Sequence, residues 1–119
     1  MRFKRPQPVP DVDGFVAVVP ASAVTPGHLT PAAVQGRPLL LTRHEGKLLA
    51  FGRYCPHAAG DLHQGSVVRY KVVCPEHDYS FDMRTGRILW PEDEVYRLPC
   101  YEVKEEDGMV KVRLGRGRE

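Results

Sequence analysis

Residues 55–82, CPHAAGDLHQGSVVRYKVVCPEHDYSFD, decide the fold because they contain two short segments of the same kind. The first segment is Cys55-Pro56-His57 and the second is Cys74-Pro75-Glu76-His77, with the sixteen residues 58–73 between them. Each segment offers one thiolate and one imidazole, which are the side chains that bind transition metals most strongly. We therefore predict that two loops, one around each segment, close on a common metal site.

The distribution of ligand types distinguishes two kinds of metal site. A zinc finger commonly groups its cysteines in one segment and its histidines in another, since all four ligands bind one tetrahedral ion. Here each segment mixes the two types, which suits a binuclear cluster whose irons take sulfur and nitrogen ligands separately. Pro56 and Pro75 follow the cysteines and restrict the backbone, so the loops should be stiff. A structural zinc site remains the alternative.

Outward from these segments, short apolar runs separated by turn residues predict an all-β fold, a sandwich or a barrel. The run 39–42 and the run 48–51 flank Gly46 and should form an antiparallel hairpin. Residues 66–73 are expected as one strand with alternating faces. The region 20–36, rich in Pro, Ser, Thr and Gly, predicts a loop with at most one helical turn. Further strands are expected over residues 15–19, 81–82, 88–90, 95–103 and 109–114.

Length, charge and cysteine count exclude several classes of protein. A chain of 119 residues allows one compact domain, and its formal net charge of +2 gives no reason to expect a nucleic-acid partner. No apolar stretch reaches the roughly 18 residues of a membrane span, and the N-terminal residues lack the apolar core of a secretory signal. We expect a cytoplasmic protein with no membrane partner. An odd count of three cysteines then argues against disulfides, and Cys100 is expected to be a core residue.

The double motif, followed by Phe81-Asp82 and Thr85-Gly86, resembles the Rieske ferredoxin family. The resemblance covers residues 14–114. It implies antiparallel β-sheets in a Rieske-like sandwich or barrel, with a small cluster-binding lobe inserted at about residues 53–92. Residues 1–13 would then be a flexible N-terminal segment and residues 115–119 a C-terminal tail.

The same resemblance implies one Rieske-type 2Fe-2S cluster and a role for each ligand. Cys55 and Cys74 would bind the inner iron. His57 and His77 would bind the outer iron through Nδ1, which leaves their Nε2 edges near solvent for electron exchange.

A family of this kind implies a soluble one-electron carrier and not an enzyme by itself. We expect a monomer that passes electrons between a reductase and a terminal redox enzyme such as an oxygenase. One alternative is a small Rieske subunit of a larger oxidoreductase, such as assimilatory nitrite reductase. A second alternative, from a different class, is a zinc-stabilised binding module, which would be colourless.

Two positions indicate a low reduction potential. Rieske proteins of high potential place Ser and Tyr hydroxyls against the cluster where this sequence has Tyr79 and Phe81, and Phe81 cannot donate a hydrogen bond. Asp78 adds a carboxylate beside His77. Fewer donors stabilise the added electron less, so we expect a potential toward the low end of the roughly −150 to +300 mV Rieske range.

Overall fold

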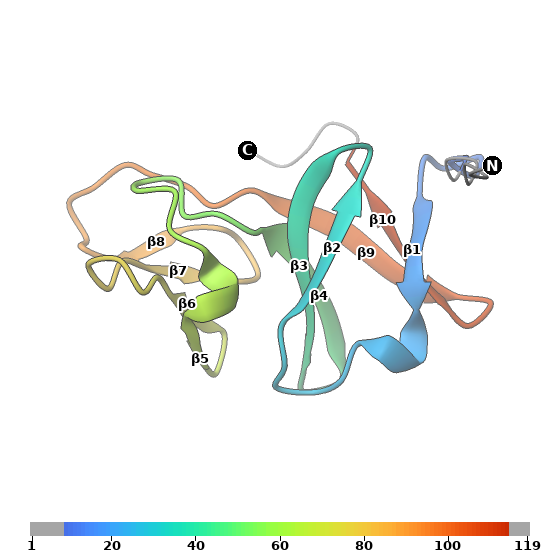
Figure 1. Cartoon of the computed structure of the whole chain (residues 1–119), viewed down its shortest axis with the longest axis horizontal. Coiled ribbons are helices and arrows are strands. Elements are labelled where there is room, and N and C mark those ends of the chain that lie inside the picture. Colours follow the sequence, from blue (N-terminus) through green and yellow to red (C-terminus); the bar gives the residue numbers. More distant parts are fainter. Residues whose placement is uncertain (1–8, 115–119) are drawn as a thin grey trace, which may run out of the picture.

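Two antiparallel sheets of unequal size make up the chain in a computed structural model that describes residues 9–114 (Figure 1). The larger sheet has six strands in the order β1-β10-β9-β4-β3-β2, and β1 also lies against β2, so the sheet nearly closes into a barrel. Its strands are β1 (Val16–Pro20), β2 (Thr30–Val34), β3 (Arg37–His44), β4 (Lys47–Gly52), β9 (Cys100–Glu106) and β10 (Met109–Arg113).

The smaller sheet has four strands in the order β5-β6-β7-β8 and is inserted between β4 and β9. We call the segment between β4 and β9 the lobe; it lies at one end of the molecule, on the left of Figure 1. Its strands are β5 (Ser66–Val68), β6 (Lys71–Val73), β7 (Ser80–Asp82) and β8 (Ile88–Trp90). Two single 3-10 turns, η1 (Ala21–Ala23) and η2 (Leu62–Gln64), complete the described secondary structure. The predicted all-β class is confirmed.

The β3–β4 hairpin forms where the sequence predicts it. Leu39 pairs with Gly52 and Leu41 with Ala50, and the turn places Glu45 and Gly46 at positive φ. Two consecutive residues at positive φ are the requirement of the tight turns that match strand twist, and glycine meets it without steric cost.

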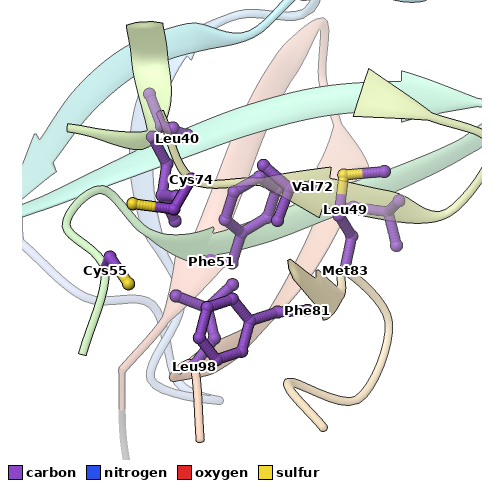
Figure 2. Packing of buried hydrophobic residues seen from close by; sticks show 10 residues of the cluster. Leu40, Leu49, Phe51, Cys55, Val72, Cys74, Phe81, Met83 and Leu98 are labelled. Carbon is purple, nitrogen blue, oxygen red and sulfur yellow. The ribbon is translucent and has the colours of Figure 1, made fainter. Parts of the chain in front are cut away.

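Alternation along these two strands sends neighbouring residues into two different cores. Leu39 and Leu41 belong to a core inside the large sheet. Leu40, which lies between them, belongs with Phe51 to a second core that also contains Phe81 of the lobe. Figure 2 shows this second core, in which residues of the large sheet and of the lobe pack together. The lobe is therefore joined to the large sheet by a shared hydrophobic core as well as by the chain.

Three sequence predictions differ from the structure. The region 20–36, predicted as a loop, contains strand β2 in addition to the single turn η1. Residues 66–73 form a hairpin of β5 and β6 and not one strand, because Arg69 adopts a positive φ of 58° and reverses the chain. The strand predicted over 95–103 begins only at Cys100.

Two of the sequence predictions concern residues outside the range 9–114. Residues 1–8 of the predicted flexible segment and the predicted tail 115–119 lie outside the described residues. Within residues 9–114, no helix is long and apolar enough to cross a bilayer.

Candidate metal centre

The first loop of the site, residues 53–61, connects β4 to η2 and is closed by its own hydrogen bonds. The amide of Cys55 donates to the carbonyl of Gly60 (2.8 Å), and the amide of Ala59 donates to the carbonyl of Cys55 (2.8 Å). At the base of the loop, the guanidinium of Arg53 donates two bonds of 2.9 Å to the carboxylate of Asp61. Bidentate pairs of this kind fix geometry well, so the loop has a defined shape around Cys55.

The second loop, residues 74–79, connects β6 to β7. The amide of Cys74 donates to the carbonyl of Tyr79 (2.7 Å) and so closes the loop. Between them, His77 and Asp78 take left-handed conformations with φ of 67° and 60°. Non-glycine residues rarely adopt such values, and they tend to occur at functional sites. The turn places His77 at the exposed tip of the loop.

Cys55 and Cys74 are buried together. Their exposed fractions are 2% and 0%, and both belong to the core that the lobe shares with the large sheet. Figure 2 shows the two side chains at one edge of that core. Burial, together with the neighbouring Cys55 thiol, raises the pKa of Cys74 to about 11, although the amide of Glu76 donates to its sulfur (3.4 Å). Two adjacent buried thiols become thiolates only when a cation compensates their charge, as a metal ligand requires.

His57 and His77 differ in their surroundings. The two rings have centroids 6.2 Å apart. His77 is exposed, whereas His57 is half-buried and its Nδ1 atom is buried without a hydrogen-bond partner, the one such side-chain atom among residues 9–114. A buried polar atom without a partner is costly, and a metal bond to Nδ1 would satisfy it. His77 is thus the more exposed of the two residues.

Aromatic side chains surround His57. The Tyr79 ring lies parallel to the imidazole at 3.9 Å, with an interplanar angle of 6°, and the Tyr96 ring meets it edge-on at 5.1 Å. The Tyr79 hydroxyl donates to Glu94 (3.3 Å). Burial and the Glu94 carboxylate raise the pKa of Tyr79, so this hydroxyl remains a donor at neutral pH. From the sequence, Tyr79 was noted only as the residue at a position where high-potential proteins have a hydroxyl, and neither Tyr96 nor Glu94 was connected with the site.

Gly60 allows the two loops to approach one another. A Cβ atom at this position would lie 2.7 Å from Cys74 Sγ and 2.7 Å from Glu76 Cγ. The one signal for Gly60 in the sequence is its place five residues after Cys55, and this weak signal was not used.

The four predicted ligands therefore lie at one place, with sulfur in the interior and one imidazole at the surface. Within residues 9–114, no three His, Cys, Asp or Glu side chains converge as the ligands of a single metal ion do. The donor set of two thiols and two imidazoles, with an unsatisfied buried Nδ1, fits a binuclear cluster with mixed ligands.

A chain with this fold and donor set is a small iron–sulfur protein by class. The family model described as the Rieske [2Fe-2S] domain matches residues 14–102, and the chain belongs to that family. The cofactor is accordingly a Rieske-type 2Fe-2S cluster, and the sequence predictions of family and cofactor are confirmed.

Several curated relatives are ferredoxin components of similar length. The ferredoxin component of the naphthalene 1,2-dioxygenase system of Pseudomonas putida is 27% identical over 100 residues, which cover 84% of this chain and 95% of the relative. The ferredoxin component of the alkene monooxygenase system of Xanthobacter autotrophicus is 26% identical over 113 residues, which cover 94% and 91%.

Two solved structures of ferredoxins are similar to this chain in fold. The ferredoxin of carbazole 1,9a-dioxygenase from Nocardioides aromaticivorans IC177 has a TM-score of 0.75 and 26% identity, with coverage of 83% of this chain and 96% of that one. A ferredoxin chain in a complex of reduced oxygenase and oxidized ferredoxin in carbazole 1,9a-dioxygenase has a TM-score of 0.76 and 26% identity, with coverage of 89% and 97%.

Proposed function

We propose that this chain is a Rieske ferredoxin that passes single electrons from a reductase to a terminal oxygenase. The relatives of similar length are ferredoxin components of oxygenase systems, and one similar structure is a ferredoxin in complex with its oxygenase. The matches cover nearly the whole of these relatives, so the similarity includes all that such a carrier contains. The chain acts as an electron-transfer component and not as an enzyme by itself.

We assign the cluster ligands to Cys55, Cys74, His57 and His77. The observation that carries this assignment is His57 Nδ1, which is buried beside the cysteine-bearing loops without a partner. The buried thiols would bind the inner iron and the two imidazoles the outer iron. When bound, the cluster supplies a site that accepts and releases one electron.

The residues around the ligands determine where electrons are exchanged. Cys55 and Cys74 are closed off from solvent by the core, and His57 is covered by tyrosine rings. His77 is the exposed ligand, at the tip of its loop. A redox partner would therefore approach at His77, the proposed ligand that is exposed to solvent.

The proposal also includes the domain bounds, the compartment and the oligomeric state. The Rieske domain spans residues 14–114, with its cluster-binding lobe at about 53–92. Cys55 and Cys74 are thiols without a disulfide in the structure, which suits the reducing cytoplasm, and we place the protein there as a monomer.

The experiment is metal and sulfide analysis with EPR of the anaerobically purified, dithionite-reduced protein. We expect a red-brown protein with a Rieske EPR signal. In His57→Cys, which leaves three thiolates and the His77 imidazole, that signal should be replaced by one of an altered cluster. His63→Ala serves as the matched control, because His63 lies in η2 next to the first loop but outside the proposed ligand set. A colourless protein that holds zinc, or an unchanged spectrum in His57→Cys, would contradict the assignment.

Electron transfer is tested separately. The reduced protein, mixed anaerobically with the terminal oxygenase of a ferredoxin-dependent system, should lose its EPR signal as the oxygenase is reduced. Size-exclusion chromatography of the native material distinguishes the alternative of a fixed small subunit, since a carrier should elute alone.

A further inference from the structure

Tyr79 occupies the space directly against the proposed ligand His57. The two rings are nearly parallel, at 6° and a centroid distance of 3.9 Å, and Tyr96 meets the imidazole edge-on. For His77, the one ring contact found among the described residues is with His57 itself. The two imidazoles are therefore held differently, one between tyrosine rings and one in the open.

Tyr79 is fixed at both of its ends. Its carbonyl accepts the hydrogen bond from the Cys74 amide (2.7 Å), so its backbone is part of the second loop. Its hydroxyl donates to Glu94 (3.3 Å), whose own amide donates to the carbonyl of Pro91 (3.3 Å). Trp90 contacts the outer side of the Tyr79 ring, with centroids 6.4 Å apart. The side chain thus links the loop that carries Cys74 and His77 to residues 90–94.

These contacts restrict His57 in two ways. A parallel aromatic neighbour at van der Waals distance prevents the imidazole from turning about its side-chain bonds. The same ring also excludes water from one face of the imidazole, and the apolar shell around an iron site controls its solvent access and redox potential.

We propose that Tyr79 is a positioning residue for His57, that Glu94 holds it in place, and that the pair limits water on this side of the cluster. The proposal depends on the proposed assignment of His57 as an iron ligand. It assigns distinct tasks to the two histidines: His57 is the fixed, shielded ligand and His77 the exposed one.

The chain contains a matched control at Tyr70, whose ring and side-chain hydrogen-bond partners among the described residues are Glu45, His44 and Arg84 and not the four ligands. Tyr70 donates to Glu45 (3.1 Å) and contacts the ring of His44 (4.3 Å, 76°), so it forms a second tyrosine–glutamate–histidine group. Loss of either tyrosine removes a half-buried ring and a similar hydrogen bond. A general effect of such a loss would therefore appear in Tyr70→Ala as well.

The test compares the EPR g values and the midpoint potential of the cluster-loaded protein with those of four variants. Tyr79→Ala should change the g values, because the imidazole is no longer fixed. It should also raise the potential, since water stabilises the added electron. We expect a change of about tenfold in the reduction equilibrium constant, or ~59 mV for one electron. Glu94→Ala should shift the potential in the same direction.

Two variants separate the ring from the bond that holds it. Tyr79→Phe keeps the ring against His57 but loses the bond to Glu94, so its potential should shift in the same direction as that of Glu94→Ala and by less than in Tyr79→Ala, with an equilibrium constant within about threefold of native. Tyr70→Ala should leave both readouts unchanged. Native g values and potential in Tyr79→Ala would overturn the proposal, as would an equal shift in Tyr70→Ala.

If Tyr79→Ala does not retain its cluster, Tyr79→Leu is measured instead. The changes expected in its g values and potential are the same as for Tyr79→Ala. Should both variants lose the cluster, a melting temperature equal to that of the metal-free native protein supports positioning, and a lower one overturns it. If the native protein itself lacks a Rieske signal, it is the proposed ligand assignment that fails, so the two failures are distinguishable.

Discussion

Replacement of Gly60 by alanine tests whether the two loops of the site are fitted against each other. The added Cβ would lie 2.7 Å from Cys74 Sγ and from Glu76 Cγ. Unstrained carbon contacts begin near 3.5 Å, so one side has to retreat by about 0.8 Å. Glu76 is exposed and its side chain can move, but Cys74 is fully buried. The first loop must therefore move away from Cys74.

The expected size of the effect follows from this geometry. Overpacking a closed site costs about 1–3 kcal/mol. For a domain of this size each kcal/mol corresponds to about 4 °C, so the melting temperature of Gly60→Ala should fall by about 4–12 °C. Because the displaced contact is the sulfur of a proposed ligand, the loss of visible cluster absorbance to a chelator should also accelerate.

The matched control for this change is Gly52→Ala. Gly52 is also buried, but its Cβ would meet Pro99 Cδ at 3.4 Å, which is an ordinary contact. We expect Gly52→Ala to melt within about 2 °C of the native protein, as its added Cβ displaces nothing. A Gly60→Ala protein with native stability and native iron content would show that the first loop has room at Cys74 and would refute the reasoning.

Two further predictions concern the surroundings of the loops. The carboxylate of Asp61 accepts bonds from Arg53, which lowers the pKa of Asp61. Its contribution to stability is therefore fully present above the ordinary value of 3.8 and is lost as pH falls from there through the lowered pKa. Asp61→Asn should therefore lower the melting temperature at neutral pH, and the difference from native, followed by circular dichroism, should shrink in acid. Phe81→Tyr restores a hydroxyl at a position where high-potential relatives have one, so voltammetry should show a higher potential than native; an equal or lower potential would remove Phe81 as a cause of low potential.

The fold was predictable where local chemistry and tertiary structure agree. The hairpin around Gly46 combines a turn residue with apolar runs on both sides, and both signals point to the same pairing. Strand β2 was not predictable in this way, because Pro31 and its alanine neighbours have low strand propensity. It forms because it pairs with β3 along its whole length at the edge of the sheet, where proline is tolerated.

The site was predictable to the extent that its ligands are grouped in the sequence. The two short segments place a cysteine and a histidine on each loop, and the structure brings all four residues together. The contact of Tyr79 with Glu94 joins residues 15 positions apart across a loop, and no spacing rule predicts it. The same holds for Gly60, whose importance depends on how closely Cys74 approaches it in space.

Both ends of the described chain lie on the large sheet, away from the lobe (Figure 1). β1 and β10 are the first two strands in its order, whereas the lobe extends from between β4 and β9 at the opposite end of the molecule. A tether added before β1 therefore leaves the lobe unobstructed. A protein grafted through that end onto an electrode, or fused there to a redox enzyme, would keep the lobe with its four proposed ligands at the opposite end of the molecule.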